Sequence, residues 1–87
     1  MLNTVTIKDV KTKIGEWCKL KRQTQNMTQE DLATALDMSR LTIQKVENGK
    51  NATIDTLLKI AYHFDSLETI HTLLQQEIEN SNRTSLY

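Results

Sequence analysis

The chain has 87 residues, of which 38% are hydrophobic and 25% are charged, and its formal net charge is zero. This length allows one small domain with a thin core and is too short for several. We expect neither a membrane-spanning helix nor a signal peptide, because no apolar run approaches the ~18 residues that a membrane helix needs. The single Cys18 cannot form an internal disulfide, which favours a reducing, cytoplasmic location.

The charges are distributed unevenly along the chain. Residues 1–50 hold nine Lys or Arg against six Asp or Glu, whereas residues 51–87 hold two against five. A basic part that contacts phosphates and an acidic part that serves solubility or a protein partner would explain this, and so would a chance distribution of solvated charges. The zero net charge by itself argues against a nucleic-acid binder.

The chain begins with a short extension, residues 1–7, and continues with a long amphipathic helix. Apolar residues recur at steps of three and four, which predicts a helix over about Lys8 to Gln25; they are Val10, Ile14, Trp17 and Cys18.

The next stretch predicts two short helices joined by a sharp turn. Thr28 is suited to the N-cap of the first helix, with Asp31 as its capping-box partner, and Ser39 is suited to the N-cap of the second. Asp37 tolerates the positive φ that an abrupt turn requires. Gly49 suits the left-handed position just after the second helix.

The second of these helices has two different sides. Ile43 and Val46 face inward by their spacing. The other side carries mostly long polar groups, from Arg40, Leu41, Gln44 and Lys45. A helix of this kind is suited to DNA recognition.

Two further helices complete the predicted fold. Thr53 caps a fourth helix that runs to about Phe64, and Asp65 or Ser66 starts a fifth that runs to about Glu79. The fifth carries an apolar stripe of Leu67, Ile70, Leu74 and Ile78. We therefore expect one domain over residues 1–79 and a flexible tail over residues 80–87.

This arrangement resembles the Cro and phage-repressor type of helix-turn-helix, the XRE family. The resemblance covers roughly residues 14–74 and is carried by Arg22, Thr28, Gln29, Leu32, Ala33, Ser39, Ile43, Glu47, Asn48, Gly49 and Lys50. It implies an all-α, lambda-repressor-like fold, a compact bundle of five helices with a central helix-turn-helix. Asn26 and Asp37 stand where the family often has Gly, and both tolerate left-handed backbone.

The resemblance also implies roles for particular residues. An ion pair between Arg22 and Glu47 is expected to hold the first helix against the recognition helix. Residues expected to contact base edges in the major groove are Arg40, Leu41, Thr42, Gln44 and Lys45. Residues expected to bind DNA phosphates are Thr28, Gln29, Ser39, Asn48, Lys50 and Asn51.

Two classes of function follow. The first is a sequence-specific regulator of transcription that binds double-stranded DNA, as a homodimeric repressor on a pseudo-palindromic operator; the controller of a restriction-modification locus is a variant of it. The alternative is the antitoxin of a toxin-antitoxin pair, which binds a toxin protein and autoregulates its operon. RNA binding or a purely structural role is a third class.

An enzyme is the class with least support. No catalytic residues converge, and the two glycines of the chain cannot form a Gly-rich phosphate loop. We expect no metal site, because His63 and His71 have no Cys or carboxylate partners at ligand spacing, and we expect no cofactor.

Overall fold

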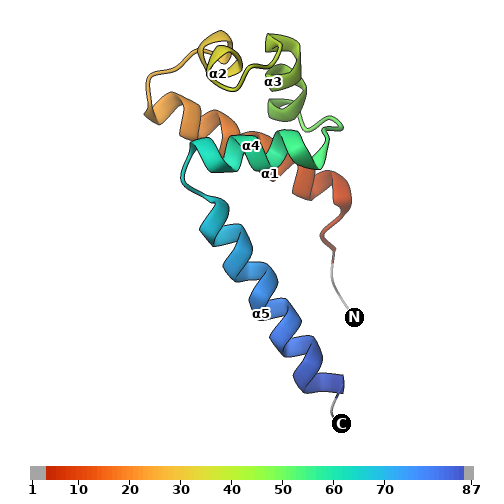
Figure 1. The fold of residues 1–87 in the computed structure, drawn as a ribbon. Coiled ribbons are helices and arrows are strands. Elements are labelled where there is room, and N and C mark those ends of the chain that lie inside the picture. Colours follow the sequence, from red (N-terminus) through yellow and green to blue (C-terminus); the bar gives the residue numbers. More distant parts are fainter. Residues whose placement is uncertain (1–3, 86–87) are drawn as a thin grey trace.

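The computed structural model describes residues 4–85 and consists, over that range, of five helices and no strand (Figure 1). The all-α fold class and the number of helices are confirmed. The helices are α1 (Ile7–Thr24), α2 (Gln29–Ala35), α3 (Arg40–Glu47), α4 (Ile54–His63) and α5 (Leu67–Ser85).

A capping box that sequence analysis missed fixes the start of α1. The Thr6 hydroxyl oxygen accepts a hydrogen bond from the Asp9 backbone N–H, and the Asp9 carboxylate accepts one from the Thr6 N–H, both at 3.0 Å. These bonds satisfy N–H groups that have no partner inside the helix. The helix therefore begins at Ile7, within the predicted extension, and the chain turns away after it at Asn26, whose φ is 56°.

The predicted caps of the two central helices are confirmed. Thr28 and Asp31 exchange hydrogen bonds of 3.0 and 2.9 Å at the start of α2, and the Ser39 side chain accepts the Thr42 N–H at 3.1 Å at the start of α3. The turn between the helices contains Asp37 at φ 55°. Gly49, at φ 70°, follows the end of α3, as predicted.

Helices α1 to α4 bury one shared core. The Trp17 ring of α1 lies edge-on to the Phe64 ring at the end of α4, with ring centroids 6.2 Å apart. The buried hydrophobic residues of this core are Cys18, Leu32, Ala33, Ile43, Val46, Ile60 and Phe64. The core thus joins residues from four helices and fixes α3 from behind.

Helix α5 extends away from α2 and α3 (Figure 1), and the molecule measures 50 × 26 × 22 Å. Its apolar stripe remains largely in solvent: Leu74 is 56% exposed and Ile78 is 53% exposed. The predicted helix end at Glu79 is corrected to Ser85. Once a helix has formed, each added residue gains a backbone hydrogen bond, so residues 80–85 continue it without a buried face.

The division into a domain over residues 1–79 and a flexible tail over residues 80–87 stays a prediction. Residues 1–3 and 86–87 lie outside the part that the structure describes. Between them, every connection from α1 to α5 is short, so the chain offers one body of four helices and one projecting helix.

Candidate nucleic-acid interface

Helix α3 has one buried side and one accessible side. Ile43 is 0% exposed and Val46 is 2% exposed, because both pack into the core. On the opposite side Leu41 is 57% exposed and therefore does not pack into the core. The core thus holds α3 from one side and leaves its other side accessible to another molecule.

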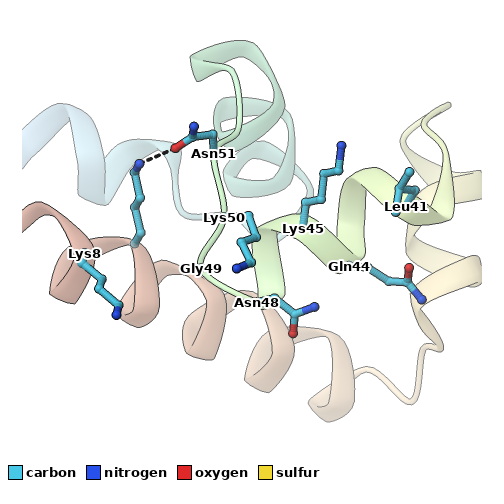
Figure 2. Close-up of a pocket in the computed structure, with 9 residues that line it drawn as sticks. Lys8, Leu41, Gln44, Lys45, Asn48, Gly49, Lys50 and Asn51 are labelled. Atoms are coloured by element: carbon cyan, nitrogen blue, oxygen red, sulfur yellow. Dashed lines mark hydrogen bonds between the residues drawn. The ribbon is translucent and has the colours of Figure 1, made fainter.

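A shallow, open depression runs along this accessible side, with a volume of about 720 Å³ (Figure 2). It lies between α3, the start of α1 and the loop that follows α3. Its lining contains no Asp or Glu; it consists of Lys8, Lys11, Leu41, Gln44, Lys45, Asn48, Gly49, Lys50 and Asn51. The depression is therefore a positively charged surface with neutral polar groups between the lysines.

The structure brings together six of the residues that sequence analysis assigned to DNA contacts. Three were assigned to base edges and three to phosphates, and all line the depression: Leu41, Gln44, Lys45, Asn48, Lys50 and Asn51. Arg40 is exposed at the first turn of α3 but is not part of the lining.

The other predicted contact residues have internal hydrogen bonds. The hydroxyl groups of Ser39 and Thr42 are 2.9 Å apart and share a hydrogen bond, while the Thr28 hydroxyl caps α2. The half-buried Gln29 side chain donates to the Glu47 carboxylate at 3.1 Å. These bonds define the starts of the two helices, and DNA contact by the same residues stays a prediction.

Sequence analysis missed Lys8 and Lys11 of α1. The Lys11 ammonium group donates a hydrogen bond to the side-chain oxygen of Asn51, which joins α1 to the loop before α4 (Figure 2). No sequence motif marks this contact, because the two residues are far apart in the chain. Only the close approach of α1 to the end of α3 brings these lysines to the depression.

That close approach depends on Gly15. A Cβ at this position would lie 2.6 Å from the Glu47 carbonyl oxygen and 2.8 Å from the Val46 carbonyl oxygen. Both neighbours are backbone atoms, so a side chain could be accommodated only if the two helices moved apart. Gly15 therefore lets α1 and α3 meet backbone to backbone.

The expected ion pair between Arg22 and Glu47 is present. The guanidinium group donates to both oxygens of the carboxylate, at 2.8 and 2.9 Å, and also to the Met27 carbonyl oxygen at 2.8 Å. Gln29 and the Cys18 thiol donate to the same carboxylate. One carboxylate on α3 thus joins this helix to both α1 and α2.

The ionisation of this group follows from its surroundings. Burial disfavours the charged form of Glu47, but hydrogen bonds from Arg22 and Gln29 outweigh it and lower the pKa of the carboxyl. The bond to Glu47 likewise raises the pKa of Arg22. Burial, together with the nearby Glu47 charge, raises the pKa of the Cys18 thiol to about 12, so the thiol is neutral and acts as a small buried donor.

Residues 4–85 lack two other kinds of feature. No helix in that range has the length and hydropathy to span a bilayer. The same residues contain no group of three or more His, Cys, Asp or Glu side chains placed to hold a metal ion. His63 instead lies edge-on to the Phe64 ring, with centroids 5.0 Å apart.

Comparison with known proteins decides the family. Residues 19–68, more than half of the chain, match the helix-turn-helix family of the XRE type. The chain belongs to this family. The family match contains α2, α3 and α4 entirely but begins inside α1, so Lys8 and Lys11 lie outside the family segment.

A related protein has been described from Methanocella arvoryzae under the name "Putative HTH-type transcriptional regulatory protein". It is 42% identical to this chain over 52 residues, which are 60% of this chain and 16% of the relative. The chain therefore spans a small part of this relative's length. The similarity supports the helix-turn-helix assignment and leaves the activity of the whole chain to be argued from its own surface.

Proposed function

We propose that the protein is a transcriptional regulator that binds double-stranded DNA in a sequence-specific manner through α3. The observation that carries this proposal is the lysine-rich depression along the accessible side of a helix whose other side is fixed by Ile43 and Val46. A rigid helix with an accessible polar side fits the major groove, and lysines around it attract the phosphates on either side.

Contacts to bases follow from side-chain chemistry. Arg40 can form two hydrogen bonds with a guanine, Gln44 can do so with an adenine, and Leu41 can contact a thymine methyl group. Lys45 reaches a base or a phosphate. The shared Glu47 carboxylate supports this reading, because it joins α3 to both α1 and α2 and so limits how the recognition helix can tilt.

Base selection is the first test. Selection of bound sequences from random duplexes by the unaltered chain should give a defined site, and Arg40→Ala or Gln44→Ala should relax it at one position each, by about 1 to 3 kcal/mol. Matched controls are Arg83→Ala and Gln76→Ala, which by helical spacing lie on the polar side of α5. Undiminished selectivity after both α3 substitutions would refute base recognition by α3.

We further propose that the functional unit is a homodimer joined through α5. The stripe of Leu74 and Ile78 is too exposed to serve the core of its own chain, and a second α5 would cover it. A two-fold dimer would bind a pseudo-palindromic operator with half-sites about one helical turn apart, and it would act as a repressor by occupying that site. A monomer in sedimentation at micromolar concentration, with and without operator DNA, would refute this.

The exposed α5 stripe also favours a second candidate, the antitoxin. In that case the occupant of the stripe is a toxin protein, and the acidic second half of the chain contributes to recognition. Co-purification with the product of a neighbouring gene, lost in Leu74→Asp but retained in Arg40→Ala, would favour this candidate. A symmetric dimer without any second protein would favour the regulator alone.

A further inference from the structure

The start of α1 carries a charge pattern that the family match does not account for. Lys8 and Lys11 are one turn apart on α1, on the side that faces α3 and its following loop, and both line the depression. Together with Lys45 and Lys50 they give the lining of this open surface four lysines and no carboxylate. Such a grouping attracts anions.

Two depressions elsewhere on the molecule differ in this respect. The one beside α4 contains Asp55 and Lys59, and the one at the start of α5 contains Asp65 and Glu68. The depression beside α3 has lysines alone as its charged groups, as does the small adjoining one that shares Lys11 and Lys50 with it. Its charge therefore reflects a local arrangement, since the chain as a whole is neutral.

The hydrogen bond between Lys11 and Asn51 gives this surface a defined geometry. Because the Asn51 side-chain oxygen accepts from Lys11, the amide nitrogen of Asn51 is directed away from Lys11 and remains a donor (Figure 2). The Lys11 ammonium group has two further N–H donors. The pair thus presents several donors and a positive charge at the edge of the depression, which suits the oxygens of a phosphodiester.

We propose that Lys8 and Lys11 bind the sugar-phosphate backbone of the DNA duplex, at the strand that borders the groove entered by α3. This inference rests on the proposed DNA binding and adds to it a contact from α1, outside the matched residues 19–68. The lysines add affinity and fix the register of α3, while the choice of sequence remains with Gln44 and its neighbours on α3.

The test is the salt dependence of duplex binding by Lys8→Gln/Lys11→Gln. Each phosphate neutralised by a lysine contributes about 0.9 to the magnitude of the slope of log K against log salt concentration. In the double variant the magnitude of this slope should therefore be smaller by about 1.8. When salt is raised from 50 to 200 mM, the double variant should therefore lose about tenfold less affinity than the unaltered chain loses. The selected base sequence should not change.

The matched control is Lys13→Gln/Lys21→Gln, which removes two charges from α1 on the side away from the depression. Lys13 forms only an exposed ion pair with Glu16, so its removal should cost little stability. Lys8→Arg/Lys11→Arg retains both charges and should retain the slope. Circular dichroism melts of each variant verify that the four-helix body is unchanged.

Three results would overturn this inference without refuting the proposed DNA binding. An unchanged slope in Lys8→Gln/Lys11→Gln relative to the control would show that these lysines do not contact phosphate. A changed base preference would show contact with bases. Tight binding of inorganic phosphate alone, at the affinity of the duplex, would make the site one for a small anion. Absence of any salt-dependent duplex binding by the unaltered chain would refute the proposed function as well.

Discussion

Helices α3 and α5 are both amphipathic, yet they differ in how far their apolar sides are buried. Ile43 and Val46 of α3 are buried in the core that α1 to α4 share, whereas the stripe of α5 is more than half exposed at Leu74 and Ile78. Periodicity in the sequence predicts both helices equally well. The comparison teaches that an apolar stripe indicates a partner without saying whether the partner lies in the same chain.

The difference has a local cause. α3 packs closely on α1 because Gly15 has no side chain to separate the two backbones. In addition, the Glu47 carboxylate of α3 accepts hydrogen bonds from both α1 and α2. No described residue provides such a contact for the outer half of α5, where residues 71–83 are all exposed. Substitutions in the two regions should therefore differ in size and in their dependence on protein concentration.

The largest effect is expected at Glu47. Glu47→Ala leaves the buried Arg22 guanidinium without its carboxylate, and removing one partner of a buried ion pair costs about 3 to 5 kcal/mol. Urea unfolding measures the loss. Glu30→Ala, at an exposed position of α2, is the control and should change stability by less than ~0.5 kcal/mol. Equal melting temperatures for the two variants would contradict the structural role of the pair.

A pair of leucine truncations compares the core that fixes α3, represented by Leu32 of α2, with the stripe of α5. Leu32→Ala removes a side chain that is 0% exposed and should cost about 2 to 5 kcal/mol at any protein concentration. Leu74→Ala should cost less than ~0.5 kcal/mol when the protein is dilute.

Concentration then separates the possible occupants of the stripe. If α5 pairs with a second α5, the cost of Leu74→Ala should grow as the concentration rises above the dimer dissociation constant. A Leu74→Ala cost as large as that of Leu32→Ala at nanomolar concentration would show that α5 is packed within its own chain, and it would remove the contrast.

Gly15→Ala should lower stability by an intermediate amount, although alanine favours a helix more than glycine does. Alanine is favoured over glycine inside a helix by up to ~1 kcal/mol, but its Cβ would press on the backbone of Val46 and Glu47. Forcing an extra methyl group into such a contact typically costs about 1 to 3 kcal/mol, so net destabilisation is expected in thermal unfolding. A stabilised variant would show that α1 and α3 separate easily.

How much of this could be predicted from the sequence depends on how local the signal is. The caps at Thr28, Ser39 and Thr53 and the left-handed turn at Asp37 are encoded within a few residues, and the structure confirms them. The pair of Arg22 and Glu47 was predicted only through resemblance to a family, because nothing local joins residues so far apart.

The rest of the candidate site depends on tertiary contacts. Lys8 and Lys11 reach the depression only because α1 and α3 meet at Gly15, and a glycine inside a predicted helix is equally consistent with a weak point. The end of α5 was placed too early because its last residues have no period, and period indicates burial, not helicity. The sequence thus predicts α3 and its cap better than the surface around them.

The smallest expected effect is a decrease of folding stability at acid pH. It arises in the body formed by α1 to α4 and not in the apolar stripe of α5. Because the pKa of Glu47 is lower in the folded state than its ordinary value of about 4.3, its contribution is fully present above that value and is lost as pH falls through the folded-state pKa. Urea unfolding from pH 6 to pH 3 should show this decline. Glu47→Gln should be less stable at pH 6 and show a shallower decline.

Hydrogen bonds from the Thr28 backbone and side chain also lower the pKa of Asp31. Some decline of stability with falling pH should therefore remain in Glu47→Gln and disappear when Asp31→Asn is added. A decline as steep in both variants as in the unaltered chain would place the acid-sensitive groups elsewhere, outside the contact between α1, α2 and α3.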